Sequence, residues 1–126
     1  MTVRVSRPWH YRLIEAEDGG IFDLHIESGF ASWSEDHTLS SGQLASLLRD
    51  PARADLLYAA LHPIRQGEMS IPNDMIDRIA LGARDEVVAA LGDLDARFNG
   101  ACSNLLRILR GRPDRSWFGG WFEEAM

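Results

Sequence analysis

Polar and apolar residues alternate along the first forty positions, with the period of two that is typical of β-strands. Two alternating runs, residues 9–16 and 21–28, flank a Glu-Asp-Gly-Gly sequence, and Asp-Gly is a favoured two-residue hairpin turn. A turn at Asp18 and Gly19 gathers apolar side chains on one face and charged ones on the other, as in a half-buried antiparallel sheet. The pairs that this register predicts include Leu13 with Leu24, Tyr11 with Ile26, Arg12 with His25 and His10 with Glu27. We expect residues 30–34 and 3–5 to add a third and a fourth strand.

Beyond residue 39 the apolar positions recur at helical spacing. Ser40 and Gln43 fit a capping box at the start of a first helix. Pro51 suits the first turn of a second helix, which Pro63 and Gly67 are expected to end. Further apolar stripes predict helices that begin near residue 72, cover residues 87–98 and cover residues 102–111. Strands followed by helices predict one α+β domain over residues 1–126, in which a β-hairpin or small antiparallel sheet packs its apolar face against four to five helices.

Composition narrows the classes of function. The chain has 126 residues and a formal net charge of −6, which argues against direct binding of nucleic acid, because phosphates require a cationic surface. The single cysteine, Cys102, excludes an internal disulfide and a cysteine-rich zinc site, and its apolar helical setting predicts a buried, inert thiol. The N-terminus lacks an apolar signal segment, and no stretch approaches the ~20 apolar residues of a membrane span. We therefore expect a cytoplasmic protein that does not bind membranes.

Acidic residues are concentrated in the predicted sheet. Seven of them fall between residues 15 and 36, and no Lys or Arg interrupts them. An acidic sheet face suits the binding of a basic partner. The predicted partner-binding residues are Glu17, Asp18, Asp23, Glu27, Glu35 and Asp36, with Trp33 as an aromatic anchor beside them.

One group of residues on the same sheet carries possible chemistry. Strand alternation places Asp23, His25 and Glu27 on one face, and the predicted register brings His10 opposite Glu27. Two imidazoles and two carboxylates could bind a divalent metal or supply a general acid and base. Arg12 would lie beside His25 and repel a cation, so we favour the alternative, a solvated face with Arg12–Asp23 and His10–Glu27 pairs. The sequence therefore predicts no catalytic residue, no metal site and no cofactor.

The C-terminal region has two further features. Residues 116–122 contain four large aromatic side chains, which would form a binding hot spot if exposed, although we favour a tail that folds back over the core. Residues 107–115 are rich in arginine, which suits a helix C-terminus through the macrodipole. This basic segment could equally pair with the acidic region in a homodimer.

The layout resembles that of small bacterial immunity proteins from contact-dependent growth inhibition and related polymorphic toxin systems. The resemblance rests on the short strands ending in Phe30-Ala31-Ser32-Trp33, the helix entry Leu39-Ser40-Ser41-Gly42-Gln43 and the leucine-rich helices after it. It implies a cytoplasmic, non-enzymatic protein that binds and neutralises a cognate toxin, often a basic nuclease.

Three functions therefore compete. The first is a toxin inhibitor with an acidic binding surface. The second is an accessory, adaptor or homodimeric interaction module. The third, which we favour least, is a small metal-dependent enzyme that uses His10, Asp23, His25 and Glu27.

Overall fold

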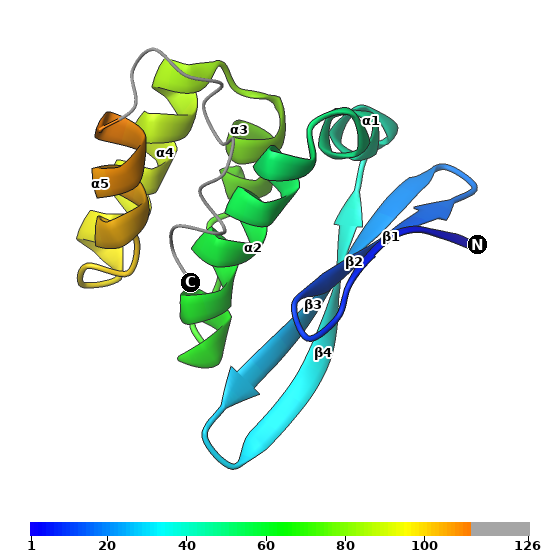
Figure 1. The fold of residues 1–126 in the computed structure, drawn as a ribbon, viewed down its shortest axis with the longest axis horizontal. Helices are drawn as coiled ribbons and strands as arrows, with labels where there is room; N and C mark the ends of the chain where they lie inside the picture. Colours follow the sequence, from blue (N-terminus) through cyan, green and yellow to red (C-terminus); the bar gives the residue numbers. More distant parts are fainter. Residues whose placement is uncertain (112–126) are drawn as a thin grey trace.

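The computed structural model describes residues 1–111, which form a four-stranded antiparallel sheet followed by five helices (Figure 1). This arrangement confirms the predicted α+β class. The strands are β1 (Thr2–Arg7), β2 (Tyr11–Ala16), β3 (Gly19–Ser28) and β4 (Ala31–Leu39), and the helices are α1 (Ser41–Arg49), α2 (Pro51–Gln66), α3 (Met75–Leu81), α4 (Arg84–Arg97) and α5 (Ser103–Arg110). The strand order is β1-β2-β3-β4, so β1 and β4 are the edge strands.

The elements form layers. Helices α1 and α2 make the main contacts with the sheet, while α3, α4 and α5 pack on these helices and on one another (Figure 1). Tyr11, Leu13, Phe22 and Leu24 are buried on the sheet face that meets the helices, as the alternation predicted. The opposite face carries exposed polar side chains on β4, among them Ser32. The sheet is therefore half-buried, and its outer face and edges are where a partner has access.

The predicted hairpin register is wrong by two residues. Leu13 lies opposite Phe22 rather than Leu24, and the turn consists of Glu17 and Asp18, neither of which has a positive φ. Gly19 (φ +150°) instead belongs to β3, where an added Cβ would lie 2.4 Å from the carbonyl oxygen of Leu39. The glycine thus serves the close approach of β4 rather than an Asp-Gly turn. Because a shift of two residues preserves the alternation, the side chains within β2 and β3 keep their predicted faces.

The helix boundaries follow the capping signals more closely. Ser40 and Gln43 form the predicted capping box, with Ser40 Oγ accepting a hydrogen bond from Gln43 N at 3.1 Å. Pro63, however, does not end α2, which continues to its C-cap at Gly67. An interior proline costs about 3 kcal/mol. Burial of Leu61 and Ile64 on either side contributes about 2 kcal/mol each, which is enough to offset that cost.

Several expectations concern the later part of the chain. Cys102 is fully buried, and desolvation, reinforced by Asp95, raises the pKa of its thiol to about 12. The thiol is therefore protonated and inert, as predicted. None of the helices among residues 1–111 is both long and apolar enough to cross a membrane. The aromatic segment 116–122 and the basic positions Arg112 and Arg115 lie outside the described residues.

Candidate functional site

The seven predicted partner-binding residues do not share one surface. Asp23, Glu27 and Asp36 lie on the outer sheet face, because they alternate with buried residues of the helix-facing side. Trp33 and Glu35 have the opposite orientation and lie toward α2. The remaining two residues, Glu17 and Asp18, form the β2–β3 turn at one end of the sheet.

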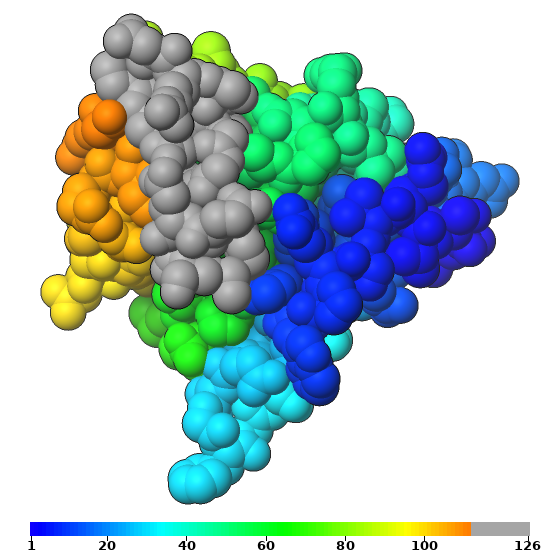
Figure 2. All heavy atoms as spheres, viewed as in Figure 1, coloured from blue at the N-terminus to red at the C-terminus, as the bar shows by residue number. Residues whose placement is uncertain are grey.

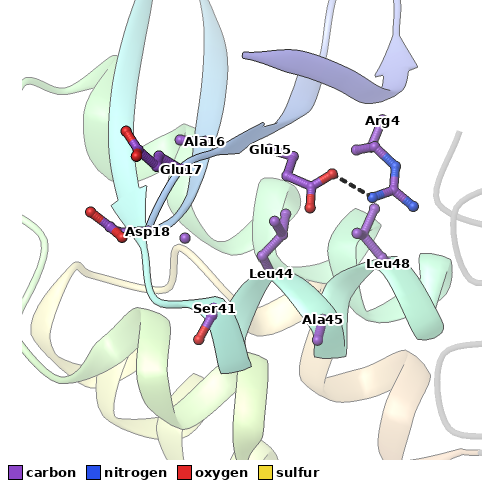
Figure 3. A pocket seen from close by; sticks show the side chains of 10 residues that line it. Arg4, Glu15, Ala16, Glu17, Asp18, Ser41, Leu44, Ala45 and Leu48 are labelled. Carbon is purple, nitrogen blue, oxygen red and sulfur yellow. Dashed lines mark hydrogen bonds and ion pairs between the residues drawn. The ribbon is translucent and has the colours of Figure 1, made fainter.

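An open groove of about 570 Å³ lies between the β2–β3 turn and α1 (Figure 3). Leu44, Ala45 and Leu48 of α1 form its floor, and the residues along its rim include Arg4, Glu15, Glu17 and Asp18. The carboxylates of Glu17 and Asp18 point outward from the turn (Figure 3). Arg4 Nη1 lies 2.7 Å from Glu15 Oε1, so one carboxylate is neutralised. Glu17 and Asp18 are exposed, and neither forms an ion pair with any residue in the described range 1–111. The groove therefore combines an apolar floor with two unneutralised carboxylates.

Two glycines and α1 determine the shape of this groove. A Cβ at Gly20 would lie 2.9 Å from a Leu44 methyl group, so α1 can pack on the start of β3 only because that side chain is missing. The absence of a side chain at Gly19 likewise allows the end of β4 to lie close to the start of β3. Leu44 and Leu48 then point from α1 toward the strands, beneath Glu15 and Arg4 (Figure 3). The sequence analysis found the acidic turn but not the helix face beneath it, since that contact depends on tertiary packing.

Glu35 is a structural residue that links β4 to α2. Arg65 binds it with two parallel hydrogen bonds, Nε to Oε1 at 2.7 Å and Nη2 to Oε2 at 2.8 Å. The Trp33 indole N–H also donates to Oε2, at 3.0 Å. The hydrogen bonds from Arg65 lower the pKa of Glu35 to about 2. A partner would have to displace Arg65 to reach this carboxylate, so Glu35 is a poor contact for a basic surface.

The carboxylates of the outer face are mostly engaged. Asp23 is buried, and its Oδ2 lies 2.6 Å from Arg12 Nη2, which confirms the predicted Arg12–Asp23 pair. Glu27 Oε1 lies 2.8 Å from His25 Nε2 rather than pairing with His10. The His10–Glu27 prediction failed with the register, since His10 O instead accepts a hydrogen bond from His25 N. Asp36 is the exposed carboxylate on this face with no ion-pair partner among residues 1–111.

Strand β3 extends past β2, and α2 satisfies its free backbone there. Glu27 N donates to His62 Nε2 at 3.2 Å, and Gln66 Nε2 donates to Glu27 O at 2.7 Å. His62 and Gln66 therefore take the place of a neighbouring strand at Glu27. His62 accepts the hydrogen bond from Glu27 N only while Nε2 is unprotonated.

The environment of this contact keeps two histidines neutral. Tyr58 separates them, with ring centroids 4.9 Å from His10 and 5.4 Å from His62. Desolvation lowers the pKa of both histidines, and positive charge adds to the effect, from Arg7 at His10 and from His25 at His62. The arrangement favours neutral packing over general acid–base chemistry.

A buried polar contact missed by the sequence analysis joins the sheet to α2. The Asp55 side chain is buried, accepts a hydrogen bond from Tyr11 Oη at 2.6 Å and forms an ion pair with Arg7. Desolvation and the Asp55 contact raise the pKa of Tyr11 above its ordinary range. The available signal was an aspartate within an apolar helical segment, which requires a partner when it is buried.

Trp9 has an unusual backbone conformation, and it does not lie at the start of a strand as predicted. It lies instead in the β1–β2 turn with φ +69° and is 74% exposed. His10 N donates to Arg7 O at 3.0 Å, and Pro8 followed by a positive φ is the pattern of a type II turn, in which glycine is usual at that third position. The Trp9 ring lies edge-on to His25, at 5.7 Å, beside a hollow of about 220 Å³. A strained, exposed tryptophan is a candidate binding residue.

The geometry of the described residues does not support a metal site at His10, Asp23, His25 and Glu27. In the part of the chain that the structure describes, no group of three or more His, Cys, Asp or Glu residues is arranged to hold a metal ion. Asp23, one of the four candidates, is already bound by Arg12. Comparison with protein-family models, curated proteins and solved structures gives no match.

Proposed function

We propose that this protein is a non-enzymatic immunity or inhibitor protein that binds and neutralises a cognate toxin, a basic nuclease, in the cytoplasm. The observation that carries the proposal is the groove beside α1, where a turn with two exposed acidic residues, Glu17 and Asp18, borders an apolar floor. Of the predicted acidic surface, these two residues and Asp36 have no ion-pair partner within residues 1–111.

The groove combines the two requirements of tight protein recognition. Nuclease active sites are cationic because they hold phosphates, and an acidic surface can occupy them in place of nucleic acid. Complementary charge raises the association rate toward ~10⁸ M⁻¹s⁻¹ at low salt. Affinity, in contrast, depends mostly on a few apolar anchors that are fully desolvated in the complex. Leu48, which is half-buried, is the accessible part of the apolar floor, since Leu44 is already buried, and the two turn carboxylates supply the charge.

The test begins with an affinity pull-down from native lysate at low and moderate salt, followed by identification of the retained protein. The proposal predicts a basic nuclease whose activity is abolished by one equivalent of this chain. The double variant Glu17→Lys/Asp18→Lys is expected to lose this inhibition. Its control, Asp74→Lys/Asp85→Lys, makes the same change in net charge at exposed positions outside this groove and is expected to inhibit normally.

Two results would contradict the proposal. One is a retained partner that is neither basic nor inhibited. The other is a groove variant that inhibits as well as the control variant does.

A further inference from the structure

The free edge of β4 offers a row of backbone hydrogen-bonding groups. In β3, the backbone of His25 forms a hydrogen bond to the residue directly before β2, and the backbone of Glu27 forms hydrogen bonds to α2. The residue between them, Ile26, therefore directs its backbone groups toward β4. The register pairs Ile26 with Trp33, so the odd-numbered β4 residues bond to β3. The even-numbered residues then direct their N–H and C=O groups outward, and these are Ser32, Ser34, Asp36 and Thr38. No hydrogen bond from another described residue engages these four outward-facing backbones.

The two edges of the sheet differ in how they are protected against pairing. Strand β1 contains a bulge between Val3 and Val5 and is followed directly by Pro8 after Arg7, features that discourage an added strand. Strand β4 pairs with β3 through nine consecutive residue pairs without a bulge and contains no proline. The charge on Glu35 is neutralised by Arg65. The β3–β4 hairpin also projects from the body of the protein (Figure 2).

The side chains of β4 favour a second copy of the same strand as the occupant. In a two-fold antiparallel pair centred on Ser34, Ser34 lies opposite itself, Ser32 lies opposite Asp36 of the second copy, and Trp33 lies opposite Glu35. In this register, each residue with outward-facing N–H and C=O groups lies opposite another such residue, so these groups can form hydrogen bonds between the two copies. A pair centred on Asp36 would instead bring two carboxylates without ion-pair partners face to face, which is unfavourable, and a pair centred on Glu35 would place two Arg65-bound carboxylates opposite each other. A pair centred on Trp33 overlaps over fewer residues of the strand.

We propose that two copies of the chain associate through β4, in an antiparallel pair centred on Ser34, to form one continuous sheet. This inference is independent of the proposed function. No β4 residue lines the groove beside α1, so association leaves that groove open in both copies.

Sedimentation of the full chain over a concentration series tests the association. The wild-type chain is expected to sediment as a dimer, and Ser34→Pro is expected to weaken dimerisation at least tenfold. Proline at this position removes an outward N–H and leaves the bonds to β3 intact, so the fold tolerates it. The matched control is Ser6→Pro on β1, whose N–H also faces outward, because Ser6 lies opposite Arg12, which bonds toward β3. This control is expected to remain dimeric.

A cysteine cross-link tests the register. Directly opposed residues of a hydrogen-bonded antiparallel pair have Cα atoms about 5.5 Å apart, within reach of a disulfide. Ser34→Cys should therefore form a covalent dimer under mild oxidation. Ser32→Cys should not, since the two copies of Ser32 would lie four positions apart, and Cys102 is buried and does not compete. A wild-type chain that stays monomeric, or a Ser34→Pro variant that dimerises as the wild type does, would overturn the proposal.

Discussion

Replacing Glu35 by glutamine tests whether this acidic residue of β4 stabilises the fold, in contrast to the accessible acidic residue on the same strand. Glutamine keeps the shape of Glu35 and one accepting oxygen, but it removes the charge opposite Arg65 and replaces the second accepting oxygen by an NH2 donor. The pKa of Glu35 falls from 4.5 to about 2 in the folded chain, and a shift of that size corresponds to about 3 kcal/mol. The side chain is 20% exposed, so solvent screening reduces the expected loss to about 1–2 kcal/mol.

The assay is chemical or thermal unfolding at pH 7, where a loss of this size lowers the melting temperature by roughly 5 °C. The neighbouring variant Asp36→Asn is the control. Asp36 is exposed on the other face, and its replacement should change the unfolding free energy by less than about 0.5 kcal/mol.

The pH dependence provides a second readout of the same pair. A carboxylate whose pKa is lowered by folding stabilises the folded chain above its unfolded pKa. The wild-type chain should therefore lose the Glu35 contribution as the pH falls from 4.5 to 2, and Glu35→Gln should lack this loss. Equal stability of Glu35→Gln and the wild type at pH 7 would refute the reasoning, as would an equal cost for Asp36→Asn.

Three further variants test other parts of the structure. Folding lowers the pKa of His62, so the unfolding free energy of the wild type should fall as the pH drops below 6.5. His62→Gln keeps an acceptor for Glu27 N but does not titrate, so this fall should become shallower in the variant. An unchanged slope between pH 7 and 5 would contradict this. Gly19→Ala should destabilise the chain by at least about 2 kcal/mol in denaturant unfolding, because the new Cβ meets Leu39 O at φ +150°, and a neutral effect would contradict the close approach. Trp9→Gly should leave the unfolding free energy unchanged or raise it by up to about 1 kcal/mol, since glycine accepts the positive φ, and a loss larger than 1 kcal/mol would show that Trp9 stabilises the fold.

The sequence predicted the class of fold because its signals are local. Strand alternation assigned each side chain of the β2–β3 hairpin to its face, and the capping box at Ser40 marked the start of α1. The register prediction was wrong because a glycine at position 19 can serve either a turn or the close approach of another strand. Only the position of β4 decides between the two. Pro63 was misinterpreted for a related reason, since the burial that offsets its cost is tertiary.

The candidate site was predictable only in part. Acidic residues can be counted in a sequence, but their neutralisation depends on partners that are distant along the chain. Arg65 lies thirty positions from Glu35, and no pattern within either segment indicates the contact. The free charge on Glu17 and Asp18 and the apolar floor from Leu44 required the packing of α1 on the sheet.

The most direct test of the groove is the association rate with the purified basic partner as a function of ionic strength. Reversing two charges beside a cationic surface should cost about 1–3 kcal/mol, or roughly 10- to 100-fold in affinity. Glu17→Lys/Asp18→Lys is expected to associate more slowly at low salt and to lose most of the salt dependence of the wild type. Asp74→Lys/Asp85→Lys should retain most of both. Identical rates and salt slopes for the two double variants would contradict the assignment of the groove as the binding surface.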